Sequence, residues 1–131
     1  MDWEGLVRAA VEARGRAYAP YSGFLVGSAL LFDDGTIVSG ANVENASSSL
    51  TLCAERVALF AGVAAGHGRP MAVVVVAEAS RPVPPCGPCL QSLAEFAGLD
   101  LPILLVLTDG RRDETRLGSL LPQPFAFDRV S

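Results

Sequence analysis

The sequence contains no lysine, so all ten of its permanently charged basic side chains are arginines. Its longest basic run is Arg111-Arg112, and its formal net charge at pH 7 is −4. Proteins that bind nucleic acids neutralise the phosphate backbone with clustered positive charge. The sequence therefore argues against a nucleic-acid partner and favours a small free substrate.

Long apolar runs and cysteines are also scarce. No stretch reaches the ~20 apolar residues of a membrane-spanning helix. Charges at Asp2, Glu4 and Arg8 interrupt the N-terminus where a signal peptide would have its apolar core. Three cysteines are too few, and odd in number, for a disulfide framework. We therefore expect a soluble, cytoplasmic protein with no membrane partner.

Apolar side chains, by contrast, are abundant. Hydrophobic residues make up 50 % of the chain and charged residues 18 %, whereas charged content is normally ~25 %. A length of 131 residues is enough for one domain with its own core, spanning residues 1–131. We expect so small and apolar a body to cover part of its surface with other copies of itself, as a homo-oligomer.

The hydrophobic pattern predicts an α/β fold. The segment 50–65 is apolar around most of a helical circumference, which predicts a helix buried on nearly all sides. Four consecutive valines within 72–77 indicate a strand covered on both faces. The order α-ββ-α-β-α-ββ predicts a three-layer α-β-α sandwich with a mixed five-stranded sheet. The expected helices cover 3–17, 50–65 and 86–97, and the expected strands cover 24–32, 36–42, 72–77, 101–107 and, at the edge, 113–117.

All three cysteines fall in two short stretches, Thr51-Leu52-Cys53-Ala54-Glu55-Arg56 and Pro85-Cys86-Gly87-Pro88-Cys89. Each stretch is expected to open a helix, where free backbone N–H groups and the helix dipole favour thiolates. Cys86 and Cys89 are three residues apart and can reach one ion, to which Cys53 can add a third sulfur. Three protein ligands leave a tetrahedral zinc ion with one open position, which is the arrangement of a catalytic site.

Glu55 follows Cys53 by two residues and is expected to stay free of the metal. Zinc lowers the pKa of its bound water from about 15.7 toward ~7, and the hydroxide could attack an electron-poor carbon that carries an amine. Glu55 would take the water proton and pass protons to a ring nitrogen and to the departing ammonia. The backbone N–H groups near Ala54 could donate to a substrate oxygen, and Arg56 could donate to the thiolates and offset their charge.

Other interpretations of these residues stay open. A structural zinc site is normally closed by a fourth protein ligand, and three buried thiols could pack as small hydrophobic groups. A cysteine nucleophile would need a base, for which the lone His67, in a glycine-flanked loop, is a poor candidate; we expect His67 at the surface. Arg56 could form a weak surface ion pair. The polar run Asn42-Val43-Glu44-Asn45 is typical of a solvated loop, but it precedes the Cys53 helix and could form the rim of the same pocket.

The sequence resembles the short, homotetrameric cytidine deaminases over roughly residues 17–126, nearly the whole chain. Besides the two cysteine stretches, the resemblance rests on separate blocks that occur in the same order and spacing. These blocks are Ala19-Pro20-Tyr21-Ser22, Phe24, Val26-Gly27, Asp34-Gly35, Gly40, Asn42-Val43-Glu44-Asn45-Ala46, Gln91, Glu95-Phe96 and Leu120-Leu121-Pro122.

The resemblance implies hydrolytic deamination of cytidine, and of 2′-deoxycytidine, to the uridine product and ammonia, in pyrimidine salvage. One zinc ion per subunit would be held by Cys53, Cys86 and Cys89, with its bound water attacking C4 of the ring. The proton shuttle would be Glu55, and Arg56 would lie on the cysteine sulfurs, in agreement with the charge argument.

The resemblance also implies a set of substrate contacts. Asn42 and Glu44 would hold the ribose hydroxyls, and Phe24 would pack against the nucleoside. Phe125 matches a family aromatic residue that reaches into the site of a neighbouring subunit. A homotetramer with active sites shared between subunits is therefore expected.

Two positions depart from the family pattern. The family usually has Tyr where Ser48 stands and Arg where Leu90 stands. Neither position is a metal ligand, the proton shuttle or one of the ribose-binding pair, so the activity is expected to persist while substrate range or assembly could differ. A deaminase of another aminated heterocycle is therefore an alternative. A non-catalytic, zinc-stabilised assembly module is an alternative of a different class.

Overall fold

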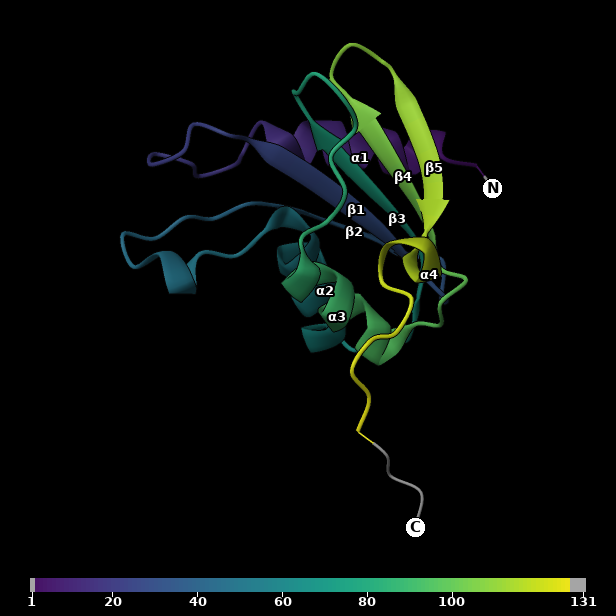
Figure 1. Ribbon diagram of the computed structural model, residues 1–131. Coiled ribbons are helices and arrows are strands. Elements are labelled where there is room, and N and C mark those ends of the chain that lie inside the picture. The colour runs from purple at the N-terminus through teal and green to yellow at the C-terminus, as the bar shows by residue number, and fades with distance from the viewer. Residues whose placement is uncertain (1, 128–131) are drawn as a thin grey trace.

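The computed structural model describes residues 2–127, and within this range the chain forms one five-stranded sheet flanked by helices (Figure 1). The strands are β1 (Val26–Phe32), β2 (Ile37–Ala41), β3 (Pro70–Ala77), β4 (Pro102–Leu107) and β5 (Arg112–Arg116). The helices are α1 (Glu4–Arg14), α2 (Ala54–Ala64), α3 (Gly87–Phe96) and α4 (Leu117–Leu120), with a 3₁₀ turn, η1 (Ser48–Leu50), before α2.

The sheet is mixed, with the strand order β2-β1-β3-β4-β5. β3 and β4 run parallel, whereas β1 pairs antiparallel with β2 and β3, and β5 pairs antiparallel with β4. Successive valines of β3 enter different cores: Val73 and Val75 pack on one face of the sheet, and Val74 and Val76 on the other. The predicted strand covered on both faces is confirmed.

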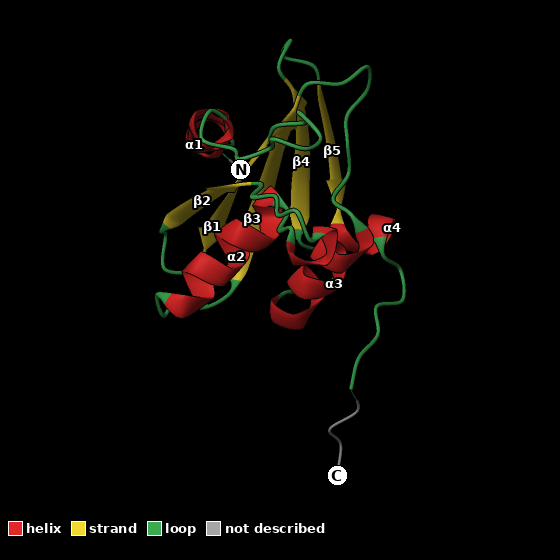
Figure 2. Ribbon diagram, turned by 90° about the vertical axis from the view of Figure 1, so that its left-hand side faces the viewer, coloured by secondary structure: helices red, strands yellow, loops and turns green. Residues whose placement is uncertain are grey.

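Helices cover both faces of the sheet, as the sequence predicts. α1 lies on one face of the sheet, and α2 and α3 lie on the other (Figure 2). On the first face, Leu6, Val7 and Ala10 of α1 belong to the same core as Val74 and Val76 of β3. The second core contains Ala58 and Leu59 from α2 and Leu90 and Leu93 from α3. This is the three-layer α-β-α sandwich with a mixed five-stranded sheet.

Two glycines allow the helices to approach the sheet closely. A Cβ atom on Gly27 of β1 would lie 2.0 Å from the carbonyl oxygen of Ala10, on α1. A Cβ atom on Gly40 of β2 would lie 2.7 Å from the backbone nitrogen of Ala58 and 3.0 Å from the carbonyl oxygen of Ala54, both on α2. Because α2 begins next to Cys53, its close packing on Gly40 also sets the position of the first cysteine.

Several predicted boundaries need correction. α1 ends at Arg14 rather than near residue 17, and α2 starts at Ala54, after the separate turn η1, rather than at residue 50. The expectation that α2 is buried on nearly all sides is wrong for the single chain, because Phe60 and Val63 are 43 % and 37 % exposed. The short helix α4 was not predicted; it begins at Leu117, where the edge strand was expected to end.

Two loops, 15–25 and 42–53, extend together from one end of the sheet (Figure 1). They are joined by backbone hydrogen bonds: Tyr18 donates to the carbonyl of Asn42, and Glu44 donates to the carbonyl of Tyr18, both at 2.9 Å. Val43 and Leu52 exchange a pair of 3.0 Å bonds within the second loop. These loops therefore stand beside the start of α2.

None of the helices within residues 2–127 has the length and apolar character that a membrane span requires.

Candidate active site

The three cysteines meet where two helices begin on the same face of the sheet. Cys53 is the N-cap residue of α2, Cys86 is the N-cap residue of α3, and Cys89 lies in the first turn of α3. The Sγ atoms of Cys53 and Cys86 are 3.5 Å apart, and those of Cys86 and Cys89 are 3.3 Å apart. The predicted ligands thus lie together, as a group that could hold a metal ion.

The geometry of this group fits zinc better than a disulfide. A disulfide needs an S–S distance of about 2.05 Å, and the observed separations are much longer. Sulfurs on a tetrahedral zinc ion, with Zn–S bonds of about 2.3 Å, are about 3.8 Å apart, close to what is observed. Among residues 2–127, no histidine nitrogen or carboxylate oxygen lies close enough to the three sulfurs to belong to this group as a fourth ligand. Three ligands for a tetrahedral ion leave one position for a water or a substrate.

Arg56 supplies positive charge beside the sulfurs. Its Nη2 donates to the Sγ of Cys53 at 3.6 Å, and its buried Nε has no hydrogen-bond partner among the described atoms. A hydrogen bond from the Cys89 thiol, supported by Arg56, lowers the pKa of Cys53 to about 5. The pKa of Cys89 is raised, because its thiol donates to Cys53 and is buried. The group therefore favours a thiolate, the form of cysteine that binds metal.

Glu55 lies in the first turn of α2 and is 4 % exposed. Burial disfavours its charged form and, together with the nearby Cys53, raises the pKa of Glu55 to about 7. A carboxyl group that titrates near neutral pH can both accept and return a proton during a reaction. This is the property expected of a general acid–base residue.

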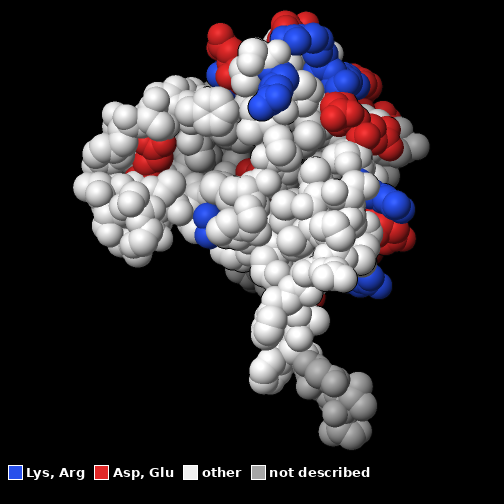
Figure 3. All heavy atoms as spheres, in the orientation of Figure 1, with Lys and Arg blue, Asp and Glu red and all other residues white. Residues whose placement is uncertain are grey.

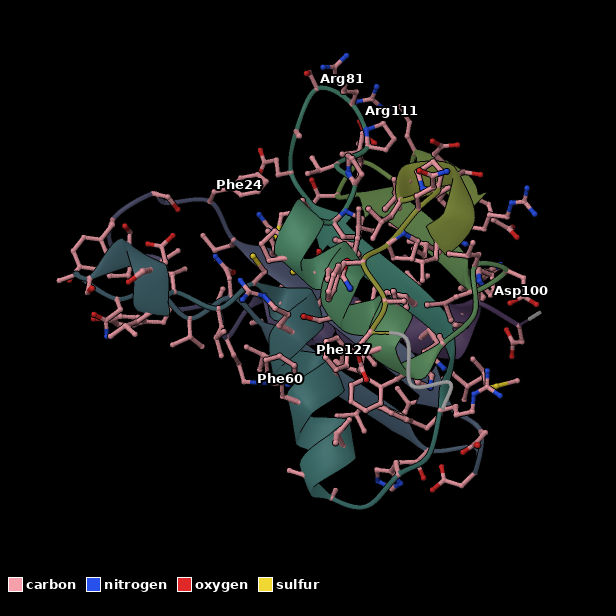
Figure 4. All side chains as sticks on the ribbon, turned by 60° about the horizontal axis from the view of Figure 1, so that its bottom comes forward. Phe24, Phe60, Arg81, Asp100, Arg111 and Phe127 are labelled. Atoms are coloured by element: carbon pink, nitrogen blue, oxygen red, sulfur yellow. The ribbon has the colours of Figure 1, made fainter. Side chains whose placement is uncertain are left out.

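A cavity of about 270 Å³ connects Glu55, Cys53 and Cys86 to the two loops. Seven of the predicted site residues line it: Phe24, Asn42, Glu44, Cys53, Ala54, Glu55 and Cys86. Its remaining lining residues are Ser22, Val26, Thr51, Leu52, Val75, Val83 and Pro84. Figure 3 shows a hollow on this side of the molecule, and Figure 4 shows Phe24 next to the β3–α3 loop, which supplies Val83 and Pro84.

Asn42 and Glu44 bind the backbone of the opposite loop. Asn42 accepts a hydrogen bond from the Val26 N–H at Oδ1 (2.9 Å) and donates from Nδ2 to the Phe24 carbonyl (2.8 Å). Glu44 Oε1 accepts from the N–H groups of Tyr21 (3.0 Å) and Ser22 (3.1 Å). A hydrogen bond from the Ser22 hydroxyl, together with these two backbone N–H groups, lowers the pKa of Glu44, so Glu44 is an ionised acceptor at neutral pH.

Phe125 is the predicted substrate contact that does not line the cavity of its own chain. Its side chain is 74 % exposed. Its backbone is nevertheless fixed to α3: the Gln91 side-chain amide donates to the Phe125 carbonyl (2.7 Å) and accepts from the Phe125 N–H (3.1 Å). The chain therefore holds an exposed aromatic ring in a defined place outside its own site.

The remaining notable residues lie away from the metal group. His67, which was expected at the surface, is half-buried: its Nδ1 lies 2.6 Å from Asp34 Oδ2, and its ring lies against Phe32. Leu90, where the family usually has Arg, is buried in the core between the sheet and the α2 and α3 helices. Ser48, where the family usually has Tyr, is exposed at the start of η1.

The sequence did not indicate every residue of the cavity. Ser22 belongs to a block that was quoted for the resemblance, yet no role was given to it. Val83 and Pro84 directly precede Pro85-Cys86, so their closeness in sequence to a predicted ligand was a usable signal. Val75 gave no signal, because its place in the cavity depends on how β3 pairs with β1 and β4 in the sheet.

Comparisons with known proteins agree with this geometry. The family model for the cytidine and deoxycytidylate deaminase zinc-binding region matches residues 2–103. A cytidine deaminase of Halalkalibacterium halodurans is 47 % identical over 131 residues, covering 100 % of this chain and 99 % of the relative. The crystal structure of a cytidine deaminase from Burkholderia pseudomallei is 45 % identical with a TM-score of 0.91, covering 95 % of this chain and 100 % of that one. That of the Mycobacterium tuberculosis cytidine deaminase is 42 % identical with a TM-score of 0.83, covering 97 % and 99 %. The chain is therefore an enzyme of the zinc-dependent cytidine deaminase family.

Proposed function

We propose that this protein catalyses the hydrolytic deamination of cytidine, and of 2′-deoxycytidine, to the corresponding uridine nucleoside and ammonia. The observation that carries the proposal is Glu55: a buried carboxyl group that lines the same cavity as Cys53 and Cys86. A carboxyl group that could transfer protons and two of the residues that would hold the metal thus line one cavity, next to polar residues that could bind a sugar.

Cys53, Cys86 and Cys89 would hold the zinc ion, which, when bound, acts as a Lewis acid that activates a water molecule for attack on C4 of the ring. Glu55 would accept one proton from that water and deliver it to the ring nitrogen N3. It would then take the second proton, from the hydroxyl group added at C4, and deliver it to the amine, which departs as ammonia while the C4 carbonyl forms. The backbone N–H groups at the start of α2, near Ala54, point out of the helix end and could donate to the ring carbonyl oxygen.

The sugar end of the substrate would be held by the two loops. Asn42 keeps one N–H and one lone pair beyond its contacts with Phe24 and Val26, and could exchange hydrogen bonds with a hydroxyl group. Glu44 is an acceptor and would take a hydrogen bond from a hydroxyl donor. The ring of Phe24 would pack against the nucleoside.

We further propose a homotetramer in which Phe125 enters the cavity of a neighbouring chain. Its support is the apolar surface of the single chain, where Tyr21 and Leu50 are each 64 % exposed and Phe125 is 74 % exposed. Light scattering coupled to gel filtration is expected to give four times the mass of one chain.

Pyrimidine salvage and a cytoplasmic location are the setting that we propose for this activity.

The activity can be tested by following the ultraviolet absorbance of cytidine with zinc-loaded protein. We expect conversion to uridine that stops when a chelator removes the metal and returns when zinc is added back. The Glu55→Gln variant should keep its zinc and its fold but lose about 10²–10⁴-fold in kcat, because the amide cannot carry protons.

The matched control for that variant is Glu12→Gln, which changes an exposed glutamate of α1 on the other face of the sheet. It should retain full activity. A zinc-loaded, correctly folded protein that leaves cytidine unchanged would refute the proposed substrate, and a fully active Glu55→Gln variant would refute the proposed proton transfer.

A further inference from the structure

The capacity of Glu44 to accept hydrogen bonds is almost fully used within the protein. An ionised carboxylate has about four acceptor positions, two on each oxygen. Oε1 already accepts from the N–H groups of Tyr21 and Ser22, and Oε2 already accepts from the Ser22 hydroxyl. One position is therefore left, and it lies on Oε2, the oxygen that Ser22 holds.

The Ser22 hydroxyl is itself fixed from two sides. It donates to Glu44 Oε2, and it accepts a hydrogen bond from the Phe24 N–H at 3.0 Å. Because that N–H occupies an acceptor position of the hydroxyl oxygen, the hydroxyl proton is left to point at Glu44. One serine thus connects the Glu44 carboxylate with the backbone of Phe24, and all three residues line the same cavity.

The backbone on which Ser22 depends is held in turn by Asn42. Asn42 is 7 % exposed and binds the Phe24 carbonyl and the Val26 N–H, the residues that lead into β1. Ser22, Phe24, Asn42 and Glu44 all line the cavity. A shift of the Ser22 hydroxyl would therefore move Glu44 Oε2 relative to a bound sugar while the loop stays attached through Asn42.

We propose that Ser22 is the positioning residue that orients Glu44 Oε2, so that Glu44 accepts a hydrogen bond from one sugar hydroxyl and no second one. This inference rests on the proposed nucleoside substrate. It assigns to Ser22 a role in substrate affinity and in discrimination between hydroxyls, and no role in the chemical step.

The test is the Ser22→Ala variant, with kcat and KM measured for cytidine, 2′-deoxycytidine and 3′-deoxycytidine. For cytidine we expect KM to rise about three- to tenfold, with kcat within about twofold of the unchanged protein, because only binding is affected. The increase should disappear for the one deoxynucleoside that lacks the hydroxyl bound by Glu44, and persist for the other. The Glu44→Ala variant should likewise raise KM for cytidine but leave KM unchanged for that same deoxynucleoside.

Two further variants separate positioning from a general loss of structure. Ser22→Thr keeps a hydroxyl and should restore KM, whereas Ser47→Ala, at an exposed serine of the neighbouring loop, should leave KM unchanged. An unchanged KM in Ser22→Ala, or an increase of equal size for both deoxynucleosides, would overturn the inference while leaving the deaminase activity in place.

A failure of the proposed function would look different, since the protein without substitutions would then convert none of the three nucleosides. In that case, dissociation constants from calorimetry take the place of KM. The same selective pattern is expected in the dissociation constants, and the absence of binding by all three nucleosides would overturn the inference together with the proposed substrate.

Discussion

At the scale of single residues, Arg56 allows the charge balance of the metal group to be tested. Three thiolates on Zn²⁺ give a net charge of −1, and the Arg56 guanidinium lies 3.6 Å from Cys53 Sγ. The residue following Cys89 is Leu90, which is buried in the core and carries no charge. We therefore expect this chain to depend strongly on Arg56.

We predict that Arg56→Gln lowers kcat by about 10–100-fold, as is typical when a hydrogen-bond partner of a metal ligand is removed. The deamination assay gives kcat, and atomic absorption gives the zinc content, which should stay close to one ion per chain. Arg16→Gln, at a 63 % exposed arginine in the loop after α1, is the control and should behave as the unchanged protein. A normal kcat in Arg56→Gln would mean that its contact with Cys53 has no effect on the reaction.

The residues that could be predicted from the sequence are those whose chemistry depends on local spacing. Cys86 and Cys89, three apart at a helix start, and Glu55, two residues after Cys53, needed no knowledge of the fold. Ser22 could not be predicted as a partner of Glu44, because the two residues are far apart in sequence and meet only when the loops before β1 and after β2 lie side by side. Sequence spacing does not encode such a contact.

At the scale of the elements, the position of α2 is set by Gly40. The first turn of α2 carries Glu55 and follows Cys53, and the helix backbone lies where any side chain at position 40 would be. An added methyl group would meet backbone atoms, which cannot rotate away as a side chain can. The sheet and the metal group are therefore mechanically linked through one small residue.

Accordingly, Gly40→Ala should destabilise the protein by about 1–3 kcal/mol, the usual range for overpacking, and should also reduce zinc content and activity. The measurements are the unfolding midpoint in urea and the bound metal per chain. Gly5→Ala is a suitable control, because its nearest contact would be an ordinary 3.7 Å from Ile37 Cδ1. If Gly40→Ala were as stable and as active as the control, the close approach of α2 would be irrelevant to the site.

The elements also show where composition misleads. The mixed sheet and its two helical layers were predictable, because period-two and helical patterns each bury a definite face. The exposure of the outer face of α2 could not be predicted, because Phe60 and Val63 are apolar and yet exposed in the single chain. Figure 4 shows Phe60 on the side of α2 away from the sheet. An apolar residue covered by the fold and one covered by another chain look the same in a sequence.

At the scale of the whole molecule, the proposed sharing of sites can be tested by mixing subunits. Phe125→Ala should raise KM for cytidine, because the ring is held outside its own cavity, where we propose that a neighbouring chain uses it. Phe127→Ala, at another exposed aromatic residue of the same tail, is the matched control and should have little effect. Mixed oligomers of Phe125→Ala and Glu55→Gln chains should recover a normal KM.

The reason for the recovery is that each chain supplies what the other lacks. Phe125→Ala chains keep a working Glu55, and Glu55→Gln chains keep the aromatic ring. Co-expression with two different affinity tags would isolate the mixed species for kinetic measurement. A KM that stays raised in the mixed oligomers would place the action of Phe125 within its own chain.

The distribution of charge also bears on how copies of the molecule meet. In Figure 3, charged side chains gather near the β3–α3 and β4–β5 loops and along β5, while the surface over α2 and α3 is largely uncharged. β5 forms one edge of the sheet, and its residues, Arg112 to Arg116, are almost all exposed. An open sheet edge can recruit strands from other molecules and start aggregation, and charged side chains oppose this. The arginines and acids of β5 therefore oppose pairing of this edge with strands of other molecules. We accordingly expect copies of the chain to meet through the uncharged face, where contacts between surfaces can close on themselves, rather than through β5, where pairing could continue into a fibre.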